Sequence, residues 1–340
     1  MSEKSIHILG IESSCDDTSA AILCNTKVLS NITAGQKVHE MYGGVVPELA
    51  SRAHQQNIVP VVDTALKNAG INLKDIDAIA FTSGPGLLGS LMVGTSFAKG
   101  LALALSIPLI EVHHMKAHIL AHLIDDPEKN KPTFPFLCLT VSGGHTQLVL
   151  VHDYNKMEII GSTIDDAAGE CFDKSAKMLG LPYPGGPFID QYAQKGDPNK
   201  FFFSKPKVPD FNYSFSGLKT SILYFLQKET AKNKDFIQQE LNSLCASIQE
   251  SIIDVLFDKL ILVTQKLQIN QVAIAGGVSA NSALRKRLLL EGQKRGWQTF
   301  IPKFEYCTDN AAMIAVTGYF SYLQKDFVGQ DVVAKARRIF

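Results

Sequence analysis

Apolar runs of strand length alternate with helical spacings along most of the chain. Apolar runs at 5–12 and 18–23 flank a polar turn at 13–17 and predict a β-hairpin. Pro47 opens a helix that should reach about Ala69. Later elements are expected as a strand at 77–82, a helix at 88–105, a strand at 108–112 and a helix at 114–124. This alternation of strands with helices predicts an α/β fold.

The second part of the chain repeats this order. Runs at 134–142 and 146–152 predict a second hairpin, and 181–215 has the composition of a loop-rich insertion. Helices are expected at 167–179, 216–228, 236–267, 281–295 and 309–323, and strands at 271–275 and 299–302. In 236–267 apolar residues recur every three or four positions, which is typical of a helix with one buried face.

The two parts resemble each other at two levels. Each opens with a strand, a small polar turn and a returning strand, at 10–18 and at 140–146. Each later has a strand that ends in a glycine-rich turn before a helix, at 83–90 and at 276–281. This weak duplication predicts two similar α/β domains that face a cleft. We expect them at 1–132 and 133–340, with an insertion at about 181–215.

Length and composition agree with a globular protein of two domains. The chain has 340 residues, of which 46% are hydrophobic and 19% charged. Lys plus Arg and Asp plus Glu both total 33, so a strongly basic nucleic-acid binder that acts alone is disfavoured. The six cysteines form no C-x-x-C pair, which excludes a structural zinc knuckle and predicts reduced intracellular thiols.

Neither the N-terminal segment nor the most apolar stretch of the chain suggests a membrane protein. Residues 1–7 lack the basic and apolar regions of a targeting segment. The most apolar stretch, 78–110, is interrupted by Gly84-Pro85-Gly86, Lys99 and Pro108, so no membrane-spanning helix is expected there.

Histidines are concentrated in one short segment, where four of the nine lie between 113 and 122. His114, His118 and His122 are four residues apart, and two imidazoles at this spacing on a helix can bind one metal ion. A half-exposed helix without a ligand is the alternative. The zincin motif H-E-x-x-H needs a glutamate as general base, and Met115 occupies its place, so a protease of that type is not expected.

Glycine-rich turns that follow strands form a second group of candidates. Ser142-Gly143-Gly144 presents backbone N–H groups without a nearby Cβ, and Asn281 follows Gly276-Gly277 at a predicted helix start. Tight turns also use glycine for steric reasons alone, but three such turns favour nucleotide binding. The chain has no Walker A lysine and no complete G-x-G-x-x-G, which disfavours a P-loop NTPase and a dinucleotide dehydrogenase.

Acidic residues gather near the starts of two predicted helices. Around the helix at 167–179 these are Asp165, Asp166, Glu170 and Asp173. Helix capping is the simple explanation for them. Capping would also explain Asp309 and Asn310 ahead of the last helix, and Asp309 would be a metal ligand only if the fold brought it to the histidines.

Seven segments in this order together resemble one known family. They are GIESSCDDT at 10–18, VHHMKAH at 112–118, VSGGHT at 141–146, FDK at 172–174, YPGGP at 183–187, AGGVSAN at 275–281 and TDNAAMIA at 308–315. The chain resembles the bacterial form of the TsaD family, tRNA N6-adenosine threonylcarbamoyltransferases once misnamed O-sialoglycoprotein endopeptidase. The resemblance implies the actin-like ATPase (ASKHA) fold of sugar kinases and Hsp70 chaperones, with two duplicated α/β domains around a nucleotide cleft.

The resemblance also implies a reaction and its residues. A threonylcarbamoyl group would pass from threonylcarbamoyl-AMP to N6 of adenosine 37 in tRNAs that read codons beginning with A, with release of AMP. One divalent metal ion, usually iron with zinc also seen, would be held by His114, His118 and Asp309. The implied substrate contacts are Thr140, Val141, Ser142, Gly143, Gly144, Asp173, Gly186, Asp190 and Asn281. No protein nucleophile is expected, because the carbonyl already carries a good leaving group.

The implied partners are tRNA, the TsaB paralogue and the TsaE ATPase, with threonylcarbamoyl-AMP supplied by a TsaC/Sua5-type synthase in the cytoplasm. The zero net charge agrees with a protein that relies on partners for part of its tRNA surface. Bacterial relatives often have an acidic residue where this chain has Lys116. A helix would point this position away from His114 and His118, so we expect the metal to be retained and only the charge near the tRNA entrance to differ.

Two other functions stay open from the residues alone. A phosphotransferase of the same fold, such as a carbohydrate or acetate kinase, would have similar glycine turns without a need for the histidine pair. A non-enzymatic, chaperone-like binding module would not depend on the histidines either.

Overall fold

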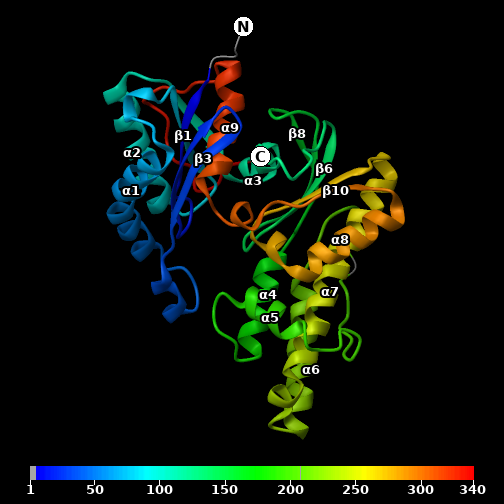
Figure 1. The fold of residues 1–340 in the computed structure, drawn as a ribbon. Coiled ribbons are helices and arrows are strands. Elements are labelled where there is room, and N and C mark those ends of the chain that lie inside the picture. The colour runs from blue at the N-terminus through cyan, green and yellow to red at the C-terminus, as the bar shows by residue number, and fades with distance from the viewer. Residues whose placement is uncertain (1–4, 207) are drawn as a thin grey trace. The chain divides into compact units, whose positions relative to one another are not determined.

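The computed structural model describes residues 5–206 and 208–340 (Figure 1). Residues 1–4, which belong to the segment expected to carry no targeting signal, lie outside the described residues. The chain folds into two compact units. The first comprises Met1–Pro132 with Pro302–Phe340, and the second comprises Thr133–Ile301.

The first unit is built on a five-stranded sheet of order β3-β2-β1-β4-β5. Its strands are β1 (His7–Glu12), β2 (Thr18–Cys24), β3 (Lys27–Ala34), β4 (Ala78–Gly84) and β5 (Leu109–His113). The first three strands pair antiparallel, whereas β4 and β5 continue parallel to β1. The predicted hairpin is confirmed as β1 and β2, with Ile8 opposite Leu23.

Helices cover both faces of this sheet, and the alternation of side chains along β1 shows why. The helices are α1 (Pro47–Ala69) and α2 (Leu88–Leu105) on one face and α3 (His114–Leu120) and α9 (Ala311–Gln324) on the other (Figure 1). Leu9 and Ile11 belong to the buried cluster with α1 and α2. Ile8, which points to the opposite face, packs in the cluster with α9.

The second unit repeats this topology with a sheet of order β10-β9-β6-β7-β8. Its strands are β6 (Phe136–Val141), β7 (Thr146–Val151), β8 (Met157–Ser162), β9 (Gln271–Ala275) and β10 (Gln298–Phe300). Again three strands pair antiparallel, and two more run parallel to the first of them. Two sheets with the same connections confirm the internal duplication.

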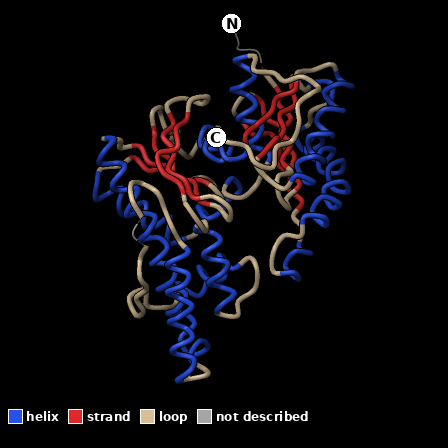
Figure 2. Tube along the Cα trace, turned by 180° about the vertical axis from the view of Figure 1, so that it is seen from behind, coloured by secondary structure: helices blue, strands red, loops and turns tan. Residues whose placement is uncertain are grey.

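The helices of the second unit bury one large apolar cluster against its sheet. Figure 2 shows the strands of each unit with the helices beside them. They are α4 (Ala168–Met178), α5 (Gly185–Ala193), α6 (Ser216–Lys232), α7 (Phe236–Leu267) and α8 (Ser282–Arg295). The predicted stripe of α7 is confirmed, since Leu244, Ile248, Ile252, Leu256 and Leu260 are all fully buried. Short 3-10 helices lie at Lys37–Tyr42, Leu73–Asp75, Ala121–Leu123, Gly277–Ala280 and Phe304–Tyr306.

The C-terminal segment differs from the expected domain division. We expected 302–340 in the second domain, but this segment belongs to the first unit. The reason is the apolar face of α9, whose residues from Ala311 to Val316 are fully buried with Ile8, Ala21 and Ala80 of the first sheet. Burial of this face ties the end of the chain to its beginning.

Helix α2 is the one described helix whose length and apolar composition would let it cross a bilayer. A core helix of a globular protein has the same properties, and Ala98 and Ala102 of α2 lie in the buried cluster with α1. The stretch 78–110 is divided into β4, a turn, α2 and β5, as its glycine and proline residues predicted.

Candidate functional site

Three parallel strands of the first unit end at the same edge of the sheet and present polar residues there. Glu12 ends β1, Thr82 lies near the end of β4, and β5 ends at His113, directly before α3. The carboxyl ends of parallel strands are where α/β proteins place their ligands. All three side chains are buried.

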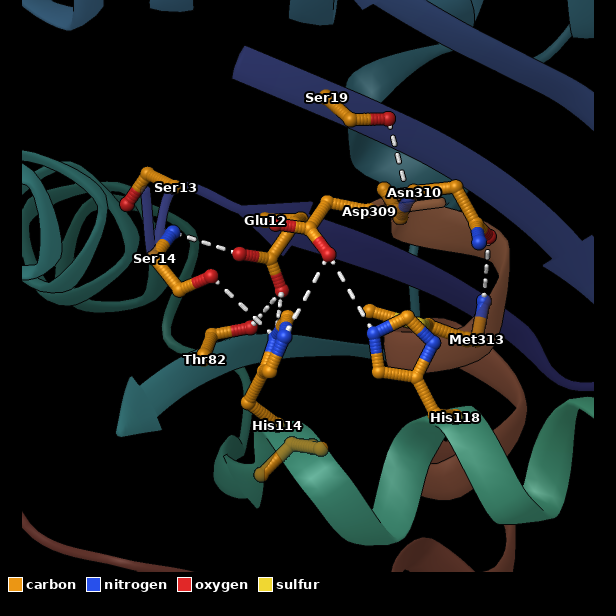
Figure 3. A network of polar contacts seen from close by, with 12 residues as sticks. Glu12, Ser13, Ser14, Ser19, Thr82, His114, His118, Asp309, Asn310 and Met313 are labelled. Atoms are coloured by element: carbon orange, nitrogen blue, oxygen red, sulfur yellow. Dashed lines mark hydrogen bonds and ion pairs between the residues drawn. The ribbon is translucent and has the colours of Figure 1, made fainter. Parts of the chain in front are cut away.

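His114, His118 and Asp309 converge at this edge (Figure 3). The Nε2 atom of His114 lies 3.4 Å from Oδ1 of Asp309, and Nε2 of His118 lies 3.3 Å from the same oxygen. The two imidazole rings meet edge to face, with centroids 4.7 Å apart. One ligand atom from each residue lies within 4.8 Å of the others. The fold therefore brings the distant aspartate to the histidine pair.

The start of α9 holds Asp309 in place. Asn310, not Asp309, caps this helix, because its Oδ1 accepts the Met313 N–H at 3.0 Å. The Ala311 N–H donates to Oγ of Ser19 on β2 at 2.9 Å, which anchors the helix start to the sheet (Figure 3). Capping therefore does not explain Asp309, whose carboxylate faces the histidines.

Charge is distributed unevenly over the two imidazoles. Burial alone would lower the pKa of His114, but the carboxylates of Asp309 and Glu12 outweigh it and raise this pKa well above its ordinary value. Burial lowers the pKa of His118. Burial opposes ionisation of Asp309, but the two histidines lower its pKa strongly. Without a cation, the cluster is therefore an imidazolium at His114 beside a carboxylate.

The donor set fits a divalent metal ion. Two imidazoles and one carboxylate are a ligand set that suits iron(II), and zinc is bound by the same ligand types. Metal–ligand bonds of about 2.0–2.2 Å bring ligand atoms to roughly 3.0–3.5 Å from one another, which is the separation of Asp309 Oδ1 from each imidazole Nε2. The Nδ1 atom of His118 is buried and has no hydrogen-bond partner among the described residues.

Two neighbouring residues lie outside this set. His122, the third of the evenly spaced histidines, falls in the 3-10 helix Ala121–Leu123, because α3 ends at Leu120. Lys116 extends its Nζ over the Phe340 ring, 5.4 Å from the centroid. Burial and the Arg338 charge lower the pKa of Lys116.

Glu12 is a site residue that the sequence did not single out. It lies within the segment GIESSCDDT, but an isolated glutamate at the end of an apolar strand gives no signal of its role. Its side chain is fully buried, and Oε2 lies 3.1 Å from Nδ1 of His114. Its pKa is lowered, because the His114 charge and hydrogen bonds outweigh burial.

In the second unit, the turn at 142–145 follows β6 closely. The Ser142 N–H donates to the His145 carbonyl at 2.8 Å, and the His145 N–H donates to Oγ of Ser142 at 3.1 Å. A Cβ on Gly143 or Gly144 would meet no atom within 4 Å, so both glycines border open space. Thr140 and Val141, by contrast, are fully buried in β6.

The acidic residues near α4 do not cap α4, so the expectation that they cap the helix at whose start they lie is wrong. Asp173 accepts the N–H groups of Gly185 at 2.8 Å and Gly186 at 3.3 Å, at the start of α5. Asp165 likewise accepts the Phe215 N–H at 2.8 Å at the start of α6. Burial raises the pKa of Asp173, although the two glycine N–H groups oppose it. These carboxylates cap helices distant in the sequence.

Asp166 and Glu170 form ion pairs with lysines instead. Asp166 contacts Lys174 at 3.1 Å and Lys219 at 2.7 Å, and Glu170 contacts Lys174 at 2.7 Å.

Asp190 and Asn281 are linked through the start of α8. Asp190 accepts the Ser282 N–H at 2.9 Å and the Ser282 hydroxyl at 2.6 Å. Asn281 caps α8 by accepting the Leu284 N–H at 2.9 Å, and its amide donates to the buried Gln249 at 2.6 Å. The predicted substrate residues thus belong to contacting segments of one unit.

Solved structures with the same fold include proteins of low sequence identity. HypF from T. kodakarensis matches 95% of this chain and 48% of its own, with a TM-score of 0.62 at 14% identity. The activator of the 2-hydroxyisocaproyl-CoA dehydratase from Clostridium difficile, solved with ADPNP, matches 95% of this chain and 99% of its own, with a TM-score of 0.50 at 13% identity. These are actin-like ATPase-fold proteins, which confirms the predicted fold.

Relatives of high identity cover the whole length. Proteins named tRNA N6-adenosine threonylcarbamoyltransferase are 64% identical in Christiangramia forsetii, over 100% of both chains, and 60% identical in Riemerella anatipestifer, over 97% of both. The Porphyromonas gingivalis protein of that name is 58% identical over 98% of this chain and 99% of its own. The family model for TsaD, tRNA N6-adenosine threonylcarbamoyltransferase, matches residues 27–316. The chain therefore belongs to the TsaD family.

Proposed function

We propose that this chain transfers the threonylcarbamoyl group from threonylcarbamoyl-AMP to N6 of adenosine 37 in tRNAs that read codons beginning with A, with release of AMP. The observation that carries this proposal is the convergence of His114, His118 and Asp309 in a chain of this family. Neither a small-molecule kinase nor a chaperone-like module accounts for three buried or half-buried ligands aimed at one point.

His114, His118 and Asp309 would hold one divalent metal ion, iron(II) in our proposal, with zinc as the alternative from the same donor set. When bound, the ion supplies Lewis-acid stabilisation of negative charge. The chain's own contribution is to keep both imidazoles and the carboxylate fixed through α3 and the capped start of α9. Ligands on rigid elements lose little freedom when they bind.

The second unit would contact the acyl-adenylate. Gly143 and Gly144 border open space, so their N–H groups can approach phosphate oxygens closely. Because Thr140 and Val141 are buried, their part is to hold the turn, while Ser142 orders it by accepting the His145 N–H. Gly186, which Asp173 holds, and Asp190 and Asn281 near the start of α8 would complete the contacts.

No side chain of this chain needs to become acylated in this reaction. Burial raises the pKa values of Cys138 and Cys171 to about 12, so neither supplies a thiolate near neutral pH. The carbonyl is already activated by its phosphate leaving group, and N6 of adenine is a poor nucleophile. Positioning of the two reactants should therefore supply much of the rate.

The partners follow from the same proposal. They are tRNA as acceptor, the TsaB paralogue, the TsaE ATPase and a TsaC/Sua5-type synthase that supplies threonylcarbamoyl-AMP, all in the cytoplasm. The chain has 33 basic and 33 acidic residues, and this balance supports the proposal that its partners provide part of the surface that binds tRNA.

Reconstitution with purified components tests this function. The chain is incubated with its partners, threonylcarbamoyl-AMP and unmodified tRNA, and digested nucleosides are measured by mass spectrometry. We expect threonylcarbamoyladenosine to form and to disappear on chelation, with activity restored by iron(II) or zinc. Phosphorylation of a small substrate by the chain, unaffected by chelation and without modified adenosine, would contradict the proposal in favour of a kinase.

A further inference from the structure

The Glu12 carboxylate is completely buried yet receives polar contacts at both oxygens. The Ser14 N–H donates to Oε1 at 2.5 Å, and the Thr82 hydroxyl donates to Oε2 at 2.5 Å. The third contact of this carboxylate is Nδ1 of His114, 3.1 Å from Oε2 (Figure 3). A buried charge is retained only where such partners compensate its loss of water.

The two nitrogens of the His114 ring face different partners. Nδ1 faces Oε2 of Glu12, with the Ser14 hydroxyl at 3.2 Å, whereas Nε2 faces Oδ1 of Asp309 at 3.4 Å. An ionised carboxylate only accepts hydrogen bonds, so Nδ1 must carry the proton in that contact. In the metal-free imidazolium Nε2 also carries a proton, and when a cation displaces that proton, Nε2 is the nitrogen that offers it a lone pair.

We propose that Glu12 is a positioning residue that accepts the Nδ1–H of His114 and thereby fixes this ring with its Nε2 lone pair toward the metal ion. Such an outer carboxylate fixes the tautomer and the orientation of a ligating imidazole and raises its basicity. The inference rests on the metal site of the proposed function. It assigns Glu12 no contact with the ion itself.

The two ligating histidines are not equivalent in this arrangement. The Nδ1 atom of His118 is buried and has no hydrogen-bond partner among the described residues, and none of the contacts of Glu12 reaches that ring. Nε2 of His118 contacts Oδ1 of Asp309 at 3.3 Å, and the neighbouring Ala117 packs in the cluster with α9. A change at Glu12 should therefore alter the signals of His114 more than those of His118.

Nitrogen NMR of the unaltered protein gives the first test. Protein labelled with 15N-histidine is loaded with zinc, and the long-range nitrogen–proton correlations of His114 are assigned by comparison with a His114→Gln variant. We expect the pattern of a ring protonated at Nδ1 and bound to metal at Nε2. Metal bound at Nδ1, or a proton at Nε2, would overturn the proposal without any change at Glu12.

Metal affinity gives the second test. Glu12→Gln removes the charge and one acceptor, and we expect affinity for cobalt(II), followed by its visible absorption, to fall about 10- to 100-fold. The matched control is Ser30→Ala, which removes another buried hydrogen bond of the first unit, from Ser30 Oγ to the Ala65 carbonyl at 2.7 Å. This control should keep the affinity of the unaltered protein.

Three outcomes separate the possibilities. Reduced affinity of Glu12→Gln, with modification activity restored by excess metal, supports the positioning role. A folded Glu12→Gln protein with unchanged affinity overturns it while the proposed function stands. Failure of the unaltered protein to bind cobalt(II) or zinc overturns both.

Thr82→Val, which removes one hydrogen bond that orients Glu12, should lower the affinity less than Glu12→Gln does. If Glu12→Gln does not fold, the metal affinity of Thr82→Val tests the positioning role in its place.

Discussion

Protonation of His114 should compete with metal binding. The carboxylates of Asp309 and Glu12 outweigh burial and raise the pKa of this imidazole well above its ordinary value, so at neutral pH the metal-free ring carries a proton that a cation must displace. We expect affinity for zinc to rise from pH 6 to pH 8 by about tenfold per pH unit for each proton displaced.

Calorimetry in buffers of different ionisation enthalpy measures that proton release directly. Release of about one proton per ion near pH 7 is the expected result. Affinity that stays constant across this range, with no proton released, would show that His114 is neutral in the metal-free protein.

Asp17 should make the metal-free protein less stable at neutral pH. Burial and the carboxylates of Asp309, Asp16 and Glu12 raise its pKa to about 7. A carboxyl group whose pKa is raised on folding stabilises the native state below its unfolded pKa, near 4, and this contribution is lost as pH rises through about 7. As pH rises from about 4 to about 7, Asp17→Asn should therefore become more stable relative to the unaltered chain.

Because Asp17 is partly exposed and screened by water, the gain should be about 1–2 kcal/mol at pH 8. Urea denaturation of both proteins at pH 4 and pH 8 measures it. An equal difference in the free energy of unfolding at the two pH values would contradict the pKa shift.

The sequence identified the histidine pair but not the residues that orient it. The spacing of His114 and His118 implies proximity on a helix, because four residues make about one turn. Asp309 lies 191 positions beyond His118, so only the fold, or the resemblance, could connect them. Nothing in the local pattern marks Glu12, whose role depends on the pairing of β1 with β4 and on the start of α3.

At the scale of elements, the position of Asp309 depends on how closely α9 approaches β1. A Cβ on Gly10 would lie 2.8 Å from both the N and Cβ atoms of Ala315, so only glycine allows this approach. We expect Gly10→Ala to destabilise the protein by about 1–3 kcal/mol and to weaken metal binding, since α9 must move.

Gly100→Ala is the matched control for this prediction. Gly100 lies in α2, where a Cβ would meet nothing within 4 Å, so alanine should stabilise the helix by about 0.5–1 kcal/mol without an effect on the metal. Denaturation and cobalt(II) titration compare both variants. If Gly10→Ala kept the metal affinity of the unaltered protein, the prediction would be contradicted, because the position of Asp309 would not depend on how closely α9 packs on β1.

Most long elements followed the hydrophobic pattern, and the missed ones show where that pattern fails. Strands β3 and β8 lie at sheet edges and are mostly only half-buried, so neither has the apolar run of a buried strand. Helix α5 begins with Gly185, Gly186 and Pro187, which are typical of a loop. It forms because Asp173, on another helix, accepts its first N–H groups.

At the scale of the whole molecule, duplication gives each unit the same sheet and a turn after its first strand. In the second unit this turn contains Gly143 and Gly144, which border open space. Valine at both positions should therefore weaken binding of an adenylate analogue by steric exclusion, at least tenfold if a few contacts worth about 1.4 kcal/mol are lost. Calorimetry with the analogue measures the affinity.

The same substitutions should leave the fold intact, because no protein atom lies where the new side chains begin. Thermal denaturation provides this control. Unaltered affinity for the adenylate analogue in a stable double variant would show that the turn does not contact the nucleotide.

The internal repeat was visible in the sequence, whereas the position of the C-terminal segment was not. Matching turns at 10–18 and 140–146 indicated two similar domains. Chain order alone then assigned 302–340 to the second of them. Which sheet the apolar face of α9 covers depends on the fit of small residues such as Gly10 and Ala315, and a pattern of hydrophobicity carries no information on that choice.

The most direct test of the central claim replaces both imidazoles in the cell. A strain whose only copy carries His114→Ala with His118→Ala is compared with one that carries the unaltered chain, and tRNA nucleosides are quantified by mass spectrometry. The account predicts loss of threonylcarbamoyladenosine together with loss of bound metal from a protein that still folds. Normal levels of the modified nucleoside in the double variant would contradict it.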